Sequence, residues 1–206
     1  MKKVCSHFPV LLSARLRLRP FTMADVPRVA ELMDDTVAST LVAVTSPYTQ
    51  DMARRWIDKH APGYEASGAL SFAVEERGSG ELAGFVGIGG SDTRAGMGYW
   101  YGQPYWGRGY ATEAGRAVVC FAFEELEIQQ ISASHLRDNL QSGRALQKMG
   151  MKYVRTHPHF VPKWDVYHDK EEYVVTRPDF EQACADDPAA FAYECSDPIE
   201  KPTETE

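Results

Sequence analysis

A glycine-rich turn joins an aromatic stretch to helix-forming residues at positions 98–114, which read Gly-Tyr-Trp-Tyr-Gly-Gln-Pro-Tyr-Trp-Gly-Arg-Gly-Tyr-Ala-Thr-Glu-Ala. The aromatic half predicts a β-strand, and a helix is expected to begin after the pair Gly107 and Gly109. Glycines let backbone N–H groups turn inward, and the positive end of the helix dipole, about half a unit charge, points at the turn. With Arg108 between the two glycines, the turn predicts a phosphate-binding site.

The glycine pair alone leaves a second interpretation open, because a plain strand–turn–helix connection contains the same Gly-x-Gly. Two common nucleotide motifs are excluded. The third glycine of a dinucleotide fingerprint is replaced by Thr112, and no Gly-Lys-Ser/Thr sequence closes the turn as it would in a Walker loop. The turn is therefore an anion site of another kind or a simple connection.

A second polar group lies where a later helix is predicted to begin, with Asn139 three residues before Ser142. Asparagine is a favoured helix N-cap, and serine is an ordinary small residue in a first turn, so both have plain structural roles. Arg144 and Lys148 are four residues apart and share a helix face, where they would either reach phosphates or stay solvated. The residues alone do not decide between these roles.

Together these segments resemble the GNAT N-acetyltransferases, and among them the Rim-type branch, which acetylates ribosomal-protein N-termini. The signature of that branch runs Gly-Tyr-Trp, several residues, then Trp-Gly-Lys/Arg-Gly-Tyr-Ala-Thr-Glu-Ala, and nearly every position is present in residues 98–114. The later segment, which begins at Asn139, matches the family's Asn-x-x-Ser-Gly-Arg. The resemblance extends over about residues 15–180.

The resemblance implies acetyl-CoA as co-substrate and no metal. Backbone groups of the strand at 99–101 would hold the pantetheine arm, and the glycine turn would bind the pyrophosphate. Asn139 would face the pantetheine and Ser142 the sulfur. The acetyl-CoA-binding residues that it implies are Tyr99, Trp100, Tyr101, Trp106, Gly107, Arg108, Gly109, Tyr110, Ala111, Thr112, Asn139, Ser142 and Arg144.

The implied reaction is attack of a neutral amine on the acetyl thioester, which needs a deprotonated amine and a proton for the departing thiolate. Many GNAT enzymes take that proton from a tyrosine seven residues after the asparagine, but this sequence has Leu146 there. The resemblance therefore assigns the catalytic role to Ser142, as in Rim-type members. Residue type allows five general bases and selects none: Glu75, Glu76, Asp92, Glu113 and His135.

The predicted acceptor is the α-amine of a protein N-terminus. Freeing a neutral amine at pH 7 costs roughly 1.2 kcal/mol for an α-amine and about 4.6 kcal/mol for lysine, so a site without an obvious strong base suits the α-amine. Glu31, Asp34 and Asp35 would attract a cationic terminus, or are ordinary surface acids. Two alternatives stay open: a small-molecule amine (polyamine, antibiotic or amino acid), and a non-catalytic acyl-CoA-binding module, which the leucine at 146 favours.

Composition limits the class of protein. The 206 residues carry a net charge of −7, which argues against nucleic acid as a direct partner and is compatible with cationic substrates. No stretch is long and apolar enough to predict a membrane span, and a cytoplasmic monomer or homodimer is expected. The four cysteines lack metal-ligand spacing; Cys120 is predicted to be a buried thiol, and a Cys184–Cys195 bridge is an alternative.

The elements that must position these residues follow from hydrophobic periodicity. We predict an N-terminal arm at 1–13, a GNAT domain at 14–180 and a mobile acidic tail at 181–206. The fold class is α/β (α+β): a mixed, mostly antiparallel sheet of about seven strands flanked by about four helices, splayed at the acetyl-CoA site as the resemblance implies. Strands are expected at 15–19, 70–75, 81–89, 97–101, 130–135, 152–161 and 166–176, and helices at 22–34, 50–60, 110–126 and 139–149.

Overall fold

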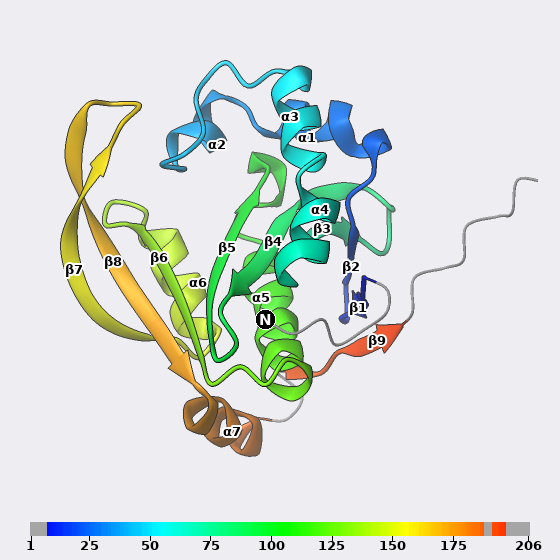
Figure 1. Ribbon diagram of the computed structural model, residues 1–206, viewed down its shortest axis with the longest axis vertical. Coiled ribbons are helices and arrows are strands. Elements are labelled where there is room, and N and C mark those ends of the chain that lie inside the picture. Colours follow the sequence, from blue (N-terminus) through cyan, green and yellow to red (C-terminus); the bar gives the residue numbers. More distant parts are fainter. Residues whose placement is uncertain (1–7, 188–190, 197–206) are drawn as a thin grey trace, which may run out of the picture.

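The computed structural model describes residues 8–187 and 191–196, and within them it holds one nine-stranded sheet with helices on both faces (Figure 1). The strand order is β7-β8-β6-β5-β4-β3-β2-β1-β9. The strands are β1 (Val10–Leu12), β2 (Leu16–Pro20), β3 (Leu70–Glu76), β4 (Leu82–Gly90), β5 (Arg94–Tyr101), β6 (Gln130–Leu136), β7 (Lys152–Val161), β8 (Val166–Thr176) and β9 (Glu194–Ser196). The predicted fold class is confirmed.

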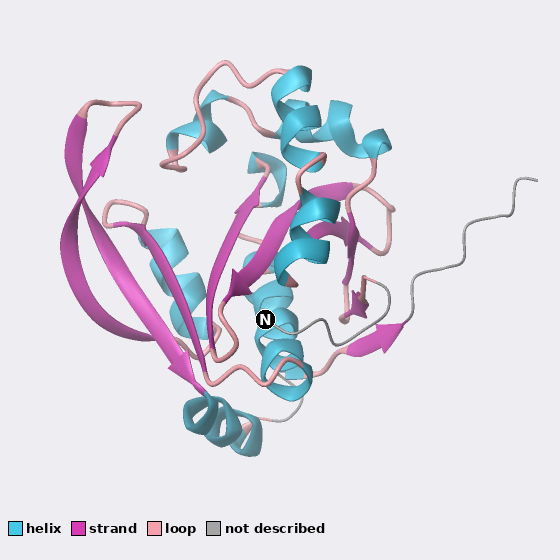
Figure 2. Ribbon diagram, viewed as in Figure 1, coloured by secondary structure: helices cyan, strands magenta, loops and turns pink. Residues whose placement is uncertain are grey.

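The helices lie on both sides of the sheet, as Figure 2 shows. They are α1 (Val26–Leu32), α2 (Asp35–Ser39), α3 (Gln50–Ile57), α4 (His60–Ser67), α5 (Tyr110–Glu125), α6 (Leu140–Lys148) and α7 (Arg177–Asp186), with 3-10 turns at Met23–Asp25 and Gln103–Tyr105. Helices α1 to α4 lie between β2 and β3 in the chain, and the other three follow β5, β6 and β8. Helix α5 connects β5 to β6, the one parallel pair among the described strand pairings, because parallel neighbours need a crossover.

Strand β5 presents alternate side chains to the two helical layers, as the period of a strand requires. Trp100 faces α3, where its ring lies 6.0 Å from that of Trp56. Tyr101 faces the other side, and its hydroxyl lies 3.5 Å from the carbonyl oxygen of Tyr110 in α5. Tyr99 points to the same side as Tyr101, toward α6. The register of β5 therefore decides which aromatic side chains reach the helices that follow it.

The parallel pairing of β5 with β6 is short. It runs from Arg94 with Gln130 to Gly96 with Ser132, although β5 continues to Tyr101 and β6 to Leu136. Beyond that point the two strands diverge (Figure 1). This is the splay that the fold class implied, and it leaves one side of the second half of β5 without a strand neighbour among the described pairings.

Both predicted flanking segments contribute to the fold, which corrects the expected arm and tail. Residues 10–12 form β1 between β2 and β9, and residues 194–196 form β9. Residues 181–186 continue α7 instead of starting a tail. The sequence shows no period here because a few apolar side chains suffice: Phe191 is buried with its ring 5.5 Å from that of Phe180. Residues 1–7, 188–190 and 197–206 lie outside the described part, so the predicted mobility of the arm and the tail stays a prediction.

Two helices were missed between the first helix and β3. The helix predicted at 22–34 is shorter: α1 ends at Leu32, and Asp34 is the N-cap of α2, where it accepts a 2.9 Å hydrogen bond from the Val37 N–H. A carboxylate suits that end of a helix. Helix α4 contains Pro62 and Gly63, which hid it in the sequence.

Cys184 and Cys195 are not bridged to each other, so the alternative of a Cys184–Cys195 bridge is wrong. Cys120 is buried as predicted. Cys5 lies outside the described residues. None of the helices in the described ranges is both long enough and apolar enough to span a membrane.

Gly84 in β4 lies where the backbone of the neighbouring strand comes close. A Cβ atom at this position would lie 2.3 Å from the Trp100 carbonyl oxygen, on the neighbouring strand β5. Backbone cannot move aside as the end of a side chain can. The absence of a side chain at Gly84 therefore lets β4 pack against β5 at the end of β5 that carries the aromatic residues.

We expect Gly84→Ala to lower the free energy of unfolding in urea by roughly 1–3 kcal/mol or more, because overpacking at a rigid position strains the backbone. Gly98→Ala is the matched control in β5, where a Cβ would meet nothing within 4 Å. Equal urea midpoints for the two variants would contradict the steric explanation.

Candidate active site

The predicted anion turn has the geometry that its glycines suggested. Gly107 and Gly109 adopt φ angles of 73° and 80°, the left-handed region that favours glycine, and Gly109 is the N-cap of α5. No side chain in the described part of the protein caps this helix. Since the first N–H groups of a helix lack partners within it, the start of α5 offers backbone donors to an anion.

Arg15, at the entry to β2, braces the turn and was not identified from the sequence. Its Nη1 atom donates to the Arg108 carbonyl oxygen at 3.0 Å, and its guanidinium lies 4.8 Å from the centre of the Tyr110 ring. Its Nη2 atom lies 2.7 Å from a Glu113 carboxylate oxygen. No local signal marks this residue, because its partners lie 93 and 98 positions away in the chain.

Tyr99 on β5 and Ser142 in α6 are in contact where β5 and β6 diverge. The Tyr99 hydroxyl oxygen lies 2.8 Å from Ser142 Oγ and 3.2 Å from the Ser142 carbonyl oxygen. Asn139 is the N-cap of α6, and its side chain accepts a 3.1 Å hydrogen bond from the Ser142 N–H. Burial raises the pKa of Tyr99 to about 12, and the hydrogen bond with Ser142 offsets only part of that rise. Tyr99 is therefore a neutral hydroxyl donor near pH 7.

The residue in the usual tyrosine position is part of the core. Leu146 is 1% exposed and points away from solvent among the largest fully buried side chains. The hydroxyl beside Ser142 comes instead from Tyr99 on β5. The sequence could name both Tyr99 and Ser142, but it could not reveal their contact, which depends on the angle between β5 and α6.

His135 lies directly beneath the first turn of α6. A Cβ on Gly143 would lie 2.8 Å from His135 Nε2, so only glycine permits this packing. The His135 Nδ1 atom lies 2.7 Å from the Leu136 carbonyl oxygen, and Nε2 lies 3.5 Å from a carboxylate oxygen of Glu171. The structure thus brings His135 close to the Ser142 turn, as a buried group.

The acidic candidates for a general base are held by other residues. Glu75 accepts from Arg19 at 2.7 Å, and Glu76 accepts a hydrogen bond from the Tyr110 hydroxyl that lowers its pKa. Burial favours a higher pKa for Glu113, but hydrogen bonds from Ser13 and Arg15 outweigh it and lower that pKa. Asp92 is exposed beside the turn between β4 and β5. These carboxylates have structural partners or lie at the surface.

The remaining predicted residues fall into four groups. Trp106 donates its indole N–H to the Tyr101 carbonyl oxygen at 2.6 Å, which fixes the chain between β5 and the turn. Trp100 faces the opposite layer from Tyr99 and Tyr101. The exposed cations Arg108 and Arg144 lie at the surface, the first in the turn and the second in the first half of α6. Ala111 and Thr112 follow Tyr110 in the first turn of α5.

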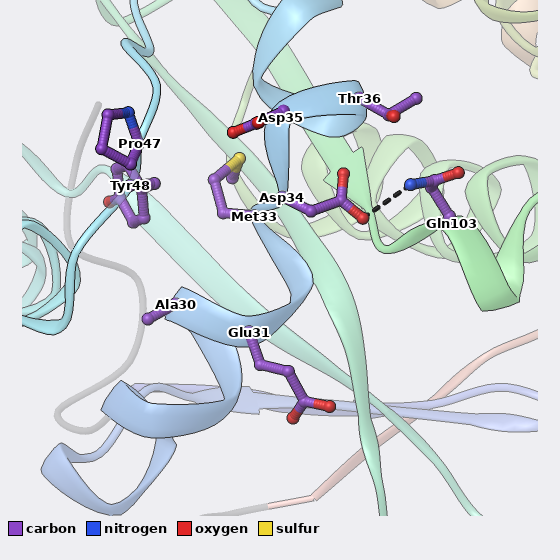
Figure 3. A pocket seen from close by; sticks show the side chains of 9 residues that line it. All are labelled: Ala30, Glu31, Met33, Asp34, Asp35, Thr36, Pro47, Tyr48 and Gln103. Atoms are coloured by element: carbon purple, nitrogen blue, oxygen red, sulfur yellow. Dashed lines mark hydrogen bonds between the residues drawn. The ribbon is translucent and has the colours of Figure 1, made fainter.

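An acidic hollow of about 470 Å³ lies beside the end of β5 (Figure 3). Its lining residues are Ala30, Glu31, Met33, Asp34, Asp35, Thr36, Pro47, Tyr48 and Gln103, which include three carboxylates and neither lysine nor arginine. Gln103 follows β5 by two residues and donates to Asp34 at 2.6 Å, so it joins this hollow to the strand that carries Tyr99. The Asp35 carboxylate accepts from Ser46.

Comparison with known proteins identifies the domain. The profile of the family described as Acetyltransferase (GNAT) domain matches residues 15–152, more than half of the chain. The uncharacterized N-acetyltransferase YoaA of Bacillus subtilis is 25% identical over 174 residues, 83% of this chain and 98% of YoaA. The FsC-acetyl coenzyme A-N(2)-transacetylase of Aspergillus fumigatus is 27% identical over 188 residues, 82% of this chain and 77% of that enzyme.

Solved structures share the fold. A Salmonella typhimurium acetyltransferase that modifies the N-terminal serine of ribosomal protein L7/L12 superimposes with a TM-score of 0.70. It is 18% identical, and the match covers 80% of this chain and 96% of that one. At 18% identity, this likeness shows that the two proteins share a fold.

The buried tyrosine predicts a pH dependence of stability. Tyr99 releases its proton near pH 12 when folded and near pH 10 when unfolded, so between these values the folded state binds more protons and stability falls as pH rises. We expect the wild type to lose about 1.4 kcal/mol more than Tyr99→Phe between pH 9 and pH 11, measured by urea denaturation.

Tyr167→Phe is the control, because Tyr167 is 71% exposed, and this variant should keep the wild-type pH dependence. The prediction fails if Tyr99→Phe loses as much stability over this range as the wild type does.

Proposed function

Because the chain belongs to the GNAT acetyltransferase family, we propose that it transfers the acetyl group of acetyl-CoA to the α-amine of a protein N-terminus. Family membership and the N-acetyltransferase relatives make the protein an acetyl-CoA-dependent N-acetyltransferase. The acceptor and the roles of individual residues are proposed from the geometry of the site. The observation that carries the choice of acceptor is the acidic hollow beside β5.

The residues present fit acetyl-CoA, which supplies the acetyl group as a thioester. The uncapped start of α5, with the left-handed Gly107 and Gly109, offers backbone N–H groups to the pyrophosphate, and Arg108 adds a positive charge. Beyond Gly96, β5 has backbone groups on its splayed side that can pair with the amides of an extended pantetheine arm. Trp100 faces the other layer and is assigned a packing role in place of a contact with the cofactor.

The Tyr99–Ser142 pair is our candidate for the proton donor. As the C–N bond forms and the C–S bond breaks, Ser142 Oγ would donate a proton to the departing sulfur, while the Tyr99 hydroxyl, 2.8 Å away, orients Ser142 and passes a proton to it. The acylated nitrogen loses one proton to solvent, and solvent returns one to Tyr99, so the pair ends as it began. A positioned acid contributes on the order of a hundredfold to ten-thousandfold in rate. In this mechanism Tyr99 supplies the phenol that many GNAT enzymes place at the position of Leu146.

The acidic hollow suits a cationic N-terminus. Glu31 forms an ion pair with Arg28 at 2.8 Å, whereas Asp34 and Asp35 accept hydrogen bonds from neutral side chains. The charges of Asp34 and Asp35 therefore attract a positive group, and no lysine or arginine is among the lining residues. The α-amine also needs less help to lose its proton, since freeing it at pH 7 costs about 1.2 kcal/mol against about 4.6 kcal/mol for lysine. The fold shared with an N-terminal serine acetyltransferase supports the same choice. We propose a cytoplasmic location, where such acceptors are made.

A small-molecule amine is the second candidate. It is favoured by the FsC-acetyl coenzyme A-N(2)-transacetylase, whose match covers 82% of this chain at 27% identity, compared with 18% identity for the ribosomal-protein acetyltransferase. Polyamines are one such class of small-molecule amine, and their positive charges would also be attracted to the acidic hollow. The third alternative, a non-catalytic acyl-CoA-binding module, rested on the leucine at 146. The hydroxyl pair beside α6 removes that reason.

Ser142→Ala tests the mechanism. We expect kcat to fall about 100-fold while the Kd for acetyl-CoA, measured by calorimetry, changes less than about threefold, because the hydroxyl acts on the departing thiolate. Ser91→Ala, in the exposed turn between β4 and β5, should keep wild-type kcat. Unchanged turnover in Ser142→Ala would remove the serine from this role.

A panel of acceptors tests the proposed function. Peptides with a free N-terminus should release CoA thiol with kcat/KM more than about 100-fold above that of the same peptides blocked at the N-terminus and carrying an internal lysine, at pH 7. Spermidine and free amino acids form the small-molecule arm. A kcat/KM for any small amine above that of every peptide would favour the second candidate, and tight acetyl-CoA binding without turnover would favour the non-catalytic module.

A further inference from the structure

Lys163 joins two segments that lie more than a hundred residues apart in the chain. It lies in the turn between β7 and β8, and its Nζ atom donates to the carbonyl oxygens of Ala38 at 2.7 Å, Leu41 at 2.5 Å and Val44 at 2.8 Å. An ammonium group has three N–H donors, so all three are used. The Trp164 ring covers the same ammonium with its centre 4.3 Å away.

The partners of Lys163 are carbonyl oxygens of α2 and of the chain that follows it. Ala38 is in the last turn of α2, and its carbonyl oxygen also accepts from the Leu41 N–H at 3.2 Å, so Lys163 uses the second lone pair of this oxygen. Leu41 and Val44 lie in the chain that follows, where their side chains pack against the core. A surface lysine normally keeps its ammonium in water, whereas this one is partly buried and its pKa is lowered by that burial. Lys163 therefore holds the β7–β8 turn against residues 38–44, and we call these three hydrogen bonds the latch.

The latched segment is also a wall of the acidic hollow. Asp35 and Thr36 precede it, Pro47 and Tyr48 follow it, and all four line the hollow. Ser46 donates to Asp35, which links the two ends of the segment. Figure 1 shows the β7–β8 hairpin rising beside α6 with its tip toward α2. Whatever holds residues 38–44 in place therefore sets the position of both ends of this wall.

We propose that Lys163 is a positioning residue that fixes the acceptor-side wall, residues 35–48, and so sets the affinity for the acceptor without contributing to acetyl-CoA binding. This inference rests on the proposed function in one respect, that the acidic hollow receives the acceptor amine. The proposed site of the cofactor, on α5, β5 and the start of α6, lies on elements that Lys163 does not contact among its described hydrogen bonds.

The test compares Lys163→Met with Lys163→Arg. Methionine keeps the length of the side chain and removes every donor, whereas arginine keeps donors and charge. Lys59→Met, at an exposed lysine that follows α3, is the control for loss of one positive charge. Each purified variant is first checked for a wild-type far-UV circular dichroism spectrum. If Lys163→Met folds poorly, Lys163→Arg is compared with the wild type in its place.

The first measurement is hydrogen exchange of peptides that cover residues 35–48, which needs no activity. Exchange there should be at least about tenfold faster in Lys163→Met, with α5 unchanged and with Lys163→Arg and Lys59→Met close to wild type. The second measurement is steady-state kinetics, in which the acceptor KM of Lys163→Met should rise about fivefold to twentyfold while the acetyl-CoA KM stays within twofold.

Unchanged exchange in residues 35–48 would overturn the latch itself. Faster exchange with an unchanged acceptor KM, or a parallel rise in the acetyl-CoA KM, would overturn the role of Lys163 in acceptor affinity. Failure of the proposed function is a different result: the wild type would then turn over a small amine and no peptide, and the same two measurements made with that amine would still decide the role of Lys163.

Discussion

Strand β5 pairs with its parallel neighbour β6 for only three residues, and the candidate site depends on where that pairing stops. The backbone N–H and C=O groups on both edges of a strand find partners when both neighbouring strands run its full length. Strand β5 continues for five residues past Gly96, and over these residues its described strand pairing is with β4 alone. A buried N–H or C=O group without a partner costs about 1–3 kcal/mol, so the open edge of β5 favours a ligand that brings amide groups of its own. The splay is at once a weakness of the sheet and a place for an extended co-substrate.

The helices that follow the two strands converge on the same opening. Helix α5 leaves the end of β5 through the glycine turn, and α6 leaves the end of β6 through the Asn139 cap. Both therefore present the positive ends of their dipoles toward the splayed region, and α5, which has no side-chain cap among the described residues, also presents backbone N–H groups there. The Tyr99–Ser142 contact spans the gap between these two units. One irregularity in strand pairing thus determines where an anion, an amide chain and a proton donor can meet.

The parts of this arrangement that could be predicted from the sequence are those whose signals are local. The glycines at 107 and 109 specify a left-handed turn before a helix, and Asn139 specifies the start of another, because turn and cap preferences act over a few residues. Arg15, the Tyr99–Ser142 contact and Lys163 could not be predicted, since each depends on partners 43 to 125 positions away. The same limit hid β1 and β9, which are three residues long; β9 pairs with β1, a partner more than 180 positions earlier in the chain.

The pairing of β1 with β9 has a consequence for how the protein is made. Translation delivers β1 first among the described strands and β9 last, so the outer edge of β1 stays open while the rest of the sheet forms. Contacts between distant parts of a chain form slowly because a large loop must close first. Val10 and Leu11 on that edge are almost fully buried in the finished protein, which makes the nascent edge apolar as well as unpaired. On the ribosome, this edge rather than the splayed one is the exposed template on which a neighbouring nascent chain could add a strand.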